Sequence, residues 1–273
     1  MTYDELKTRV HKALVLTAHA DDCEFFAGGL VARLARDGVE VAEIIATDNG
    51  RGSFELDTTE LVAQSRDREA REAARIMGKT HLDFLGYPDG FLDDTPKNEL
   101  RRRYMEIIRD FKPDLLISFD ATDANEEHPD HRHVARAALE AVSFCHLPLY
   151  HPEQAAGPHL TPYRLWFAKH PAHTNLAVDV DDFMDTVLAA LWAHESQMRM
   201  MVEDLKRNIG ATGVGAALLP LLDPDNYRPV LDMMMRLRAG NTAKSVSWPG
   251  GTAPRHAEVF RLETVTDLLN DLG

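Results

Sequence analysis

The chain alternates short apolar segments with helix-length amphipathic segments, and this alternation restricts its fold more than any other feature. Apolar or β-branched runs, typical of strands, occupy residues 13–18, 39–47, 80–86 and 114–119. The intervening segments have helical apolar spacing: one ends at Gly38, one spans 59–77 and ends at Gly78, one runs from Thr95 and Pro96 to Phe111, and one covers 131–144. The sequence therefore predicts strand–helix repeats from its first strand onward.

Strands that are apolar on both faces and alternate with helices predict a parallel sheet, because the crossover helices must cover both of its sides. We therefore expect an α/β, doubly wound, mostly parallel and Rossmann-like sheet. Further strands near 163–169, 176–180 and 257–262, and a long helix from about Asp181 to Lys206, would complete the same unit. Residues 1–273 are then one domain.

The composition changes within residues 199–255, most clearly after 207. This stretch is rich in Gly and Pro and contains the runs MMMRLRAG and SVSWPGG. We interpret it as a segment inserted into the domain, serving as a lid or as a contact between subunits. The three consecutive methionines, Met233, Met234 and Met235, are more typical of a core or a subunit contact than of a cofactor site.

The net charge of −14 disfavours nucleic acid and anionic membrane surfaces as partners, since both require clustered Lys and Arg. An apolar run long enough to span a membrane is not found in the sequence. Only two cysteines occur, and the start MTYDELKTRVHK offers neither an apolar signal core nor a basic, acid-poor transit stretch, so we expect a cytoplasmic protein.

Two clusters of histidine and aspartate follow predicted strands. His19-Ala20-Asp21-Asp22-Cys23-Glu24 comes after the first strand, and His128-Pro129-Asp130-His131 comes after the fourth. In open α/β sheets the ligand crevice lies beyond the carboxyl ends of the strands, so both clusters belong to the functional edge. Two imidazoles and one carboxylate are what a catalytic zinc ion takes. Each cluster alone is also compatible with a helix cap or a solvated pair, and Asp130 could simply cap the helix 131–144.

Together with other segments, these clusters resemble the PIG-L/LmbE-like zinc-dependent N-acetylglucosaminyl deacetylases. The resemblance covers residues 12–198 and the last strand. It is carried by H-x-D-D-x-E at 19–24, R-x-x-E-x-x-x-A-x-x-x-x-G at 66–78, Y-P-D-G at 87–90, H-P-D-H-R at 128–132, A-H-E-S-Q at 193–197 and H-A-E-V-F-R at 256–261. Two departures stand out: Ala20 replaces the usual proline, and T-D-N-G-R-G replaces T-D-G-E-x-G after the second strand.

The resemblance implies a role for each matching residue. The metal ligands would be His19, Asp22 and His131, with Zn²⁺ or another divalent transition metal as the cofactor. Asp21 would be the catalytic base, His128 would stabilise the oxyanion, and Asp130 would orient one of the histidines. The substrate contacts would include Arg66, Asp89, Asn49 and His194. Cys23 is expected to pack behind the loop rather than to bind the metal.

The implied activity is removal of the N-acetyl group from an N-acetylglucosamine-type sugar or conjugate, in a homo-oligomer. Two alternatives stay open: a related metal-dependent amidase acting on a sugar–thiol conjugate, and a non-catalytic glycan-binding module. An NAD-binding protein is disfavoured, because the first strand–helix turn is HADDCEFFAGG and lacks G-x-G-x-x-G.

Overall fold

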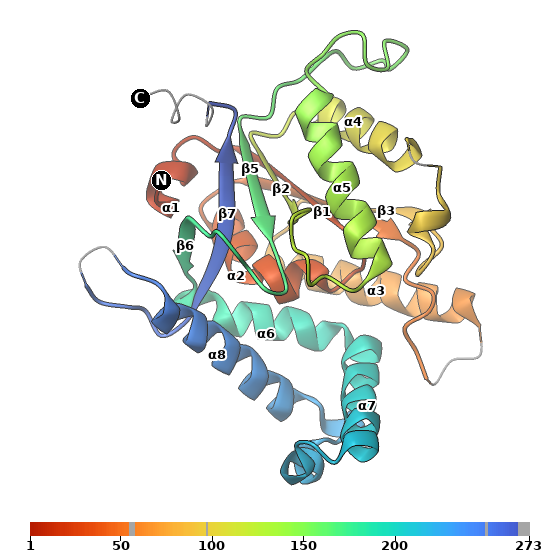
Figure 1. Cartoon of the computed structure of the whole chain (residues 1–273), viewed down its shortest axis with the longest axis vertical. Helices are drawn as coiled ribbons and strands as arrows, with labels where there is room; N and C mark the ends of the chain where they lie inside the picture. Colours follow the sequence, from red (N-terminus) through yellow and green to blue (C-terminus); the bar gives the residue numbers. More distant parts are fainter. Residues whose placement is uncertain (55–57, 97, 249–250, 267–273) are drawn as a thin grey trace.

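Seven strands form one mixed sheet in the computed structural model, which describes residues 1–54, 58–96, 98–248 and 251–266 (Figure 1). The strands are β1 (Lys12–Thr17), β2 (Glu40–Thr47), β3 (His81–Tyr87), β4 (Leu115–Phe119), β5 (Tyr163–Phe167), β6 (Leu176–Asp179) and β7 (Ala257–Thr264). Their order is β3-β2-β1-β4-β5-β7-β6. The first five strands are parallel, whereas β7 is antiparallel to β5 and β6 is antiparallel to β7. The predicted mostly parallel α/β sheet is confirmed.

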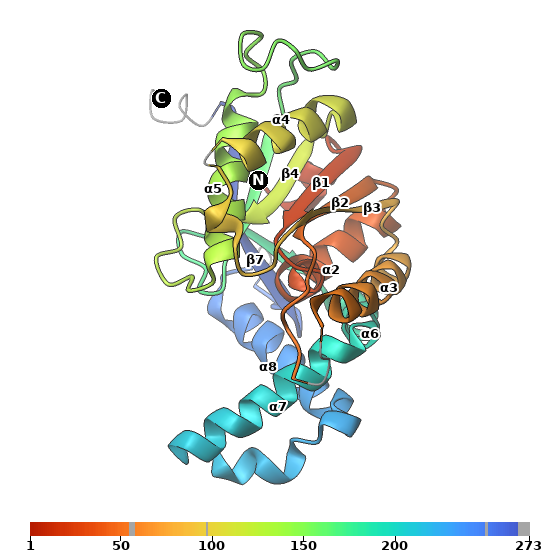
Figure 2. The ribbon, with the colours of Figure 1, turned by 90° about the vertical axis from the view of Figure 1, so that its right-hand side faces the viewer.

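Helices cover both faces of the sheet, as Figure 2 shows. The helices α2 (Asp22–Arg36), α3 (Thr59–Met77) and α6 (Met184–Ala193) lie on one face, and α4 (Glu99–Phe111) and α5 (Pro129–Phe144) lie on the other. A short helix, α1 (Tyr3–Lys7), precedes β1. Five of the six residues of β1 are buried, which explains why this strand is apolar on both sides.

Helix boundaries follow local signals at several places. Thr58 accepts a hydrogen bond from the backbone N–H of Leu61 at the start of α3, and Gly78 ends this helix with a φ of 76°. The helix α5 begins at Pro129, two residues before the predicted start, and its cap is His128 rather than Asp130. The predicted start of the third helix is wrong, because Pro96 precedes α4 and its carbonyl accepts the N–H of Glu99.

The predicted long helix 181–206 is interrupted. A 3₁₀ turn η2 (Asp181–Phe183) precedes α6, and α7 (Glu195–Thr212) begins as a separate helix after His194, whose φ and ψ are −81° and 53°. The backbone N–H of Ser196, in the first turn of α7, donates to Glu69 of α3. This carboxylate satisfies an N–H that has no partner within α7, so a tertiary contact supports the break.

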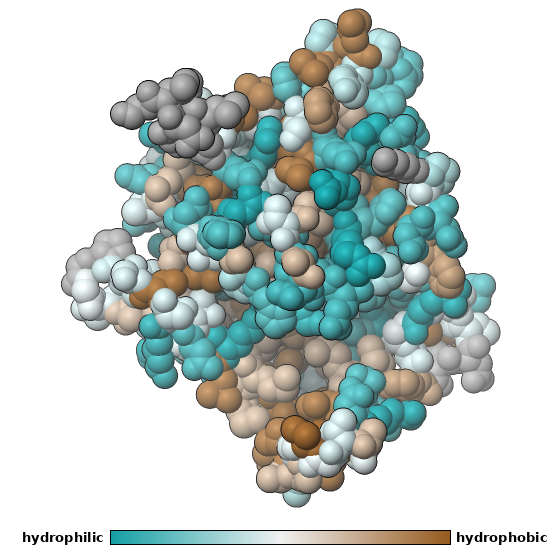
Figure 3. Space-filling model, in the orientation of Figure 1, coloured by the Kyte–Doolittle hydropathy of each residue, from teal (hydrophilic) through white to brown (hydrophobic). Residues whose placement is uncertain are grey.

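The stretch 199–255 contributes part of α7, the 3₁₀ turns η3 (Ala216–Leu221) and η4 (Pro224–Asn226), and α8 (Arg228–Ser245), which lie beyond the end toward which β5 runs (Figure 1). Another 3₁₀ turn, η1 (Leu92–Asp94), follows β3. Figure 3 shows hydrophobic side chains gathered at the lower end of the molecule, where η3 exposes Leu218, Leu219 and Leu221. Of the three consecutive methionines, Met235 alone is buried.

None of the described helices is long and apolar enough to cross a membrane. The cytoplasmic location stays a prediction.

Candidate metal centre

The first histidine–aspartate cluster begins in the loop after β1 and continues into α2. Asp22, the first residue of α2, uses its Oδ2 to accept hydrogen bonds from the backbone N–H groups of Ala18 and His19, at 3.0 and 2.7 Å. These bonds fold the loop back onto the helix start and leave Oδ1 of Asp22 directed toward α5. Here Oδ1 lies 3.2 Å from Nε2 of His131.

Three candidate ligand atoms converge at this point. Nδ1 of His19 lies 3.2 Å from Nε2 of His131 and 3.6 Å from Oδ2 of Asp22. Ligands held about 2.0–2.1 Å from a tetrahedral zinc ion lie roughly 3.3 Å from one another, and the 3.2 Å separations of Nε2 of His131 from Nδ1 of His19 and from Oδ1 of Asp22 fit such an ion. The structure therefore brings together the three residues that the sequence proposed as a ligand set.

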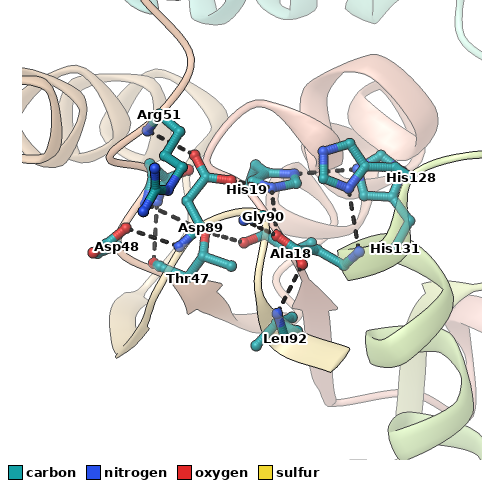
Figure 4. Close-up of polar contacts among 12 residues, drawn as sticks. Ala18, His19, Thr47, Asp48, Arg51, Asp89, Gly90, Leu92, His128 and His131 are labelled. Atoms are coloured by element: carbon teal, nitrogen blue, oxygen red, sulfur yellow. Dashed lines mark hydrogen bonds and ion pairs between the residues drawn. The ribbon is translucent and has the colours of Figure 1, made fainter. Parts of the chain in front are cut away.

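The opposite edge of the His19 ring faces the carboxylate of Asp89 (Figure 4), and the carboxylate of Asp130 lies near the same edge. Nε2 of His19 is 3.1 Å from Oδ1 of Asp89 and 3.4 Å from Oδ2 of Asp130. Although burial alone would lower it, Asp130, Asp22 and Asp89 raise the pKa of His19 well above its usual value. A carboxylate behind a metal-binding imidazole fixes the orientation and tautomer of the ring.

A second group of side chains, which includes His19, Asp89, His128 and Asp130, also lies close enough to hold an ion. Both oxygens of Asp130 already accept backbone N–H groups, from Gly90 at 2.6 Å and from Leu92 at 3.0 Å. The carboxylate of Asp130 therefore holds the backbone of the Y-P-D-G turn next to His19. The group formed by His19, Asp22 and His131 leaves Oδ1 of Asp22 available to bind an ion. This group is therefore the better candidate for the metal site.

A third group, Cys23, Glu24 and Glu43, is already occupied by a positive charge. Nζ of Lys79 lies 2.6 Å from a carboxylate oxygen of each glutamate, and all these side chains are buried. Cys23 is fully buried in the hydrophobic core, which confirms that it packs behind the loop.

Asp21, the proposed base, lies between the candidate ligands His19 and Asp22 in the chain and is buried. Burial and the neighbouring Asp22 raise the pKa of its carboxyl, whereas Arg66, His194 and His19 oppose this shift. A raised pKa suits a group that must accept a proton near neutral pH.

His128 is oriented by the backbone of its own helix. Its Nδ1 accepts the N–H of Asp130 at 3.2 Å, so the proton of the neutral ring must be on Nε2. Burial and the nearby His19 and His131 lower the pKa of His128, which favours the neutral ring. The ring centroids of His128 and His19 are 4.6 Å apart. His128 can therefore offer a single N–H donor beside the ligand set.

The four expected substrate contacts occupy different environments. Asn49, with a φ of 58°, is completely buried: its Oδ1 accepts the N–H of Ala20 at 2.8 Å, and its Nδ2 donates to Thr47. We therefore revise the role expected of Asn49, because its side chain holds in place the loop of residues 18–21, called the ligand loop below. Asp89 likewise accepts the N–H of Arg51 and contacts His19 rather than facing open space.

Arg66 and His194 are also buried. Nη2 of Arg66 donates to the carbonyl of Gly52 at 2.6 Å, and the charge of Arg66 acts to lower the pKa of Asp21. His194 stands at the junction of α6 and α7, with its Nε2 3.7 Å from Oε2 of Glu24. His194 is thus buried next to Glu24 of α2 and does not lie on an open surface.

Sequence reasoning did not single out Glu126, which precedes the H-P-D-H cluster. Oε2 of Glu126 lies 3.2 Å from Nδ1 of His131, and its Oε1 accepts the N–H of His128 at 2.8 Å. Its position in a loop without periodicity offers no signal in the sequence. The contact could be found only after the turn from β4 into α5 was known.

A cavity of about 690 Å³ lies between the loop after β2, α3 and α7, and its lining residues do not include the candidate ligands. Its lining includes Ser53, next to the Gly52 carbonyl that Arg66 contacts, and Ser196 of the A-H-E-S-Q motif. Arg68, Arg199 and Glu69 also line it, and half of its lining residues are charged.

Comparison with known proteins shows the family to which the chain belongs. Residues 14–142 match the family described as PIG-L, GlcNAc-PI de-N-acetylase. Diacetylchitobiose deacetylase of Thermococcus kodakarensis is 32% identical over 192 residues, which cover 69% of this chain and 70% of that protein. A probable N-acetyl-alpha-D-glucosaminyl L-malate deacetylase 2 of Bacillus anthracis is 29% identical, with 71% of this chain and 84% of that protein covered.

A solved structure has the same architecture over nearly the whole chain. N,N'-diacetylchitobiose deacetylase from Pyrococcus horikoshii superposes with a TM-score of 0.76 at 25% identity, covering 96% of this chain and 90% of that one. The fold and the site thus define an α/β protein of the deacetylase type. The chain belongs to the PIG-L/LmbE-like family of N-acetylglucosaminyl deacetylases.

Proposed function

We propose that this protein hydrolyses the acetamide of an N-acetylglucosamine-type sugar or sugar conjugate, with zinc as its cofactor. The observation that carries this proposal is the convergence of His19 Nδ1, Asp22 and His131 Nε2 within 3.2–3.6 Å, beside the buried carboxyl of Asp21. The family relatives, which are named as deacetylases of acetylated sugars, support the substrate class.

The donor set suits zinc, because two imidazole nitrogens and one carboxylate leave a fourth position open. His19, Asp22 and His131 would hold the ion. When bound, zinc would lower the pKa of a coordinated water toward ~7 and polarise the substrate carbonyl.

The protein's own groups would move the proton and stabilise the developing charge. Asp21 would accept a proton from the attacking water while the oxygen of that water bonds to the acetamide carbon. The carbonyl oxygen then becomes an oxyanion, and Nε2–H of His128 would donate to it. When the carbon–nitrogen bond breaks, Asp21 would return the proton to the amine, so acetate and a free amine leave.

Three buried contacts would keep this arrangement rigid. Asp130 and Asp89 would hold the ring of His19, and Asn49 would hold the backbone of Ala20 between the ligands. Arg66, whose charge acts to lower the pKa of Asp21, stays a proposed contact with the sugar. The cavity beside Gly52 is large enough for part of a sugar conjugate.

The decisive experiment is an assay of amine release from N-acetylglucosamine, diacetylchitobiose and N-acetylglucosaminyl conjugates of malate and inositol. We expect the zinc-loaded protein to release amine and acetate from at least one of these compounds, and Asp21→Asn to release neither at a comparable rate. If the zinc-loaded native protein bound these sugars without releasing acetate, a glycan-binding role would replace the proposal. Cleavage of a sugar–thiol conjugate alone would favour the amidase.

We also propose a homo-oligomer joined through residues 199–255. The exposed apolar side chains of Leu218, Leu219 and Leu221 support this proposal, because clustered apolar side chains on a surface are typical of subunit contacts. Light scattering coupled to size-exclusion chromatography should give a mass above that of one chain. A monomeric mass at micromolar concentration would contradict it.

A further inference from the structure

Glu126 connects the two histidines of the H-P-D-H cluster. One oxygen, Oε2, lies 3.2 Å from Nδ1 of His131, and the other, Oε1, accepts the backbone N–H of His128 at 2.8 Å. The residue is 9% exposed, so its carboxylate is largely held within the protein. Arg132 fixes the same turn by donating to the carbonyls of Glu126 and Glu127.

We propose that Glu126 is a positioning residue that sets the tautomer of His131 for metal binding, an inference that rests on the proposed metal site. An ionised carboxylate has no proton to donate, so its negative charge 3.2 Å from Nδ1 of His131 favours the tautomer whose proton is on Nδ1. In the neutral ring that binds the ion, Nε2 then keeps its lone pair, and this atom faces His19 Nδ1 and Asp22.

The two histidine ligands are thereby supported in the same way from opposite sides. His19 presents Nδ1 to the ion and rests its Nε2 against Asp89 and Asp130. His131 presents Nε2 and rests its Nδ1 against Glu126. Carboxylates in this position orient the ring and make it a stronger ligand.

The substitution Glu126→Gln tests the tautomer because it preserves the size of the side chain. The backbone N–H of His128 is a donor, so the amide oxygen of the glutamine would turn toward it. The amide NH₂ would then face Nδ1 of His131 and would favour the tautomer whose proton is on Nε2. That tautomer cannot bind a metal ion through Nε2.

The readout is zinc affinity, measured by competition with a chromogenic chelator. We expect Glu126→Gln to weaken zinc binding by about 10- to 100-fold, and to weaken it at least as much as Glu126→Ala does. The neighbouring Glu127 is exposed, so Glu127→Gln is the matched control and should bind zinc like the native protein. Thermal unfolding of the metal-free variants would show whether each one folds.

A purely structural role predicts another order of effects. If Glu126 only held the turn, Glu126→Gln would retain native zinc affinity and Glu126→Ala would lose the most thermal stability, and the inference would be overturned. The absorption spectrum of the Co²⁺-substituted protein gives a second readout, which should change in Glu126→Gln and remain native in Glu127→Gln. If the native protein itself bound neither metal, the proposed metal site would fail as well.

Discussion

His19 and His131 face each other through Nδ1 and Nε2 at 3.2 Å, although 112 residues separate them in the chain. Both rings have a carboxylate at the far nitrogen, so the two near nitrogens are directed at one point. In the metal-free protein, these carboxylates favour the protonated forms of both histidines. Burial alone would lower the pKa of His131, but Asp22 and Glu126 raise it from 6.5 to about 9.

Zinc binding should release protons at pH 7, because His131 is then protonated in the metal-free protein and must lose its proton to bind the ion. Apparent affinity should therefore increase as the pH rises from about 6.5 to 9. Protonation of His131 also stabilises the folded, metal-free protein. This contribution to the free energy of unfolding is complete below pH 6.5 and is lost as the pH rises through about 9. Calorimetry in buffers of different ionisation enthalpy measures the protons released. A binding enthalpy independent of the buffer would contradict this prediction.

Metal binding and proton transfer should be separable by mutation. His19→Ala removes a ligand atom and should leave the purified protein without zinc. Asp21→Asn should retain zinc and lower kcat by about 10²- to 10⁴-fold, the usual contribution of a general base. Elemental analysis and steady-state kinetics on both variants test this division. Loss of zinc from Asp21→Asn would mean that the roles of ligand and base are exchanged.

His128 should act on the transition state and not on the metal. His128→Ala removes the Nε2–H donor and should lower kcat by about 10²- to 10³-fold, as the loss of other oxyanion donors does. Zinc content should stay native, and KM should change little. A large rise in KM with an unchanged kcat would instead assign this side chain to binding the ground state.

Lys79 should be essential for stability. Its ammonium group contacts both Glu24 and Glu43 in the protein interior. Lys79→Met leaves two buried carboxylates without a cation and should lower the free energy of unfolding by about 3–5 kcal/mol. Urea unfolding at pH 7 measures the loss, with the exposed Lys244→Met as the control. The prediction fails if both variants unfold at the same urea concentration.

The strands of the sheet could be predicted from sequence because each depends on a local pattern. The segments 13–18 and 114–119 are apolar on both faces, and they form β1 and β4 within one or two residues of the predicted bounds. The break after Ala193 could not be predicted in this way, since the local sequence contains neither Gly nor Pro. It depends on Glu69, which belongs to another helix and accepts the N–H of Ser196.

The same distinction applies to the site. The sequence by itself determined which chemical groups follow the first and fourth strands, because His19, Asp22 and His131 are defined by short motifs with characteristic spacing. Only the tertiary structure decided the partners of these groups. It turned Asn49 and Asp89 inward against the ligand loop and placed Glu126 behind His131, because the contacts of buried polar groups depend on how distant segments pack.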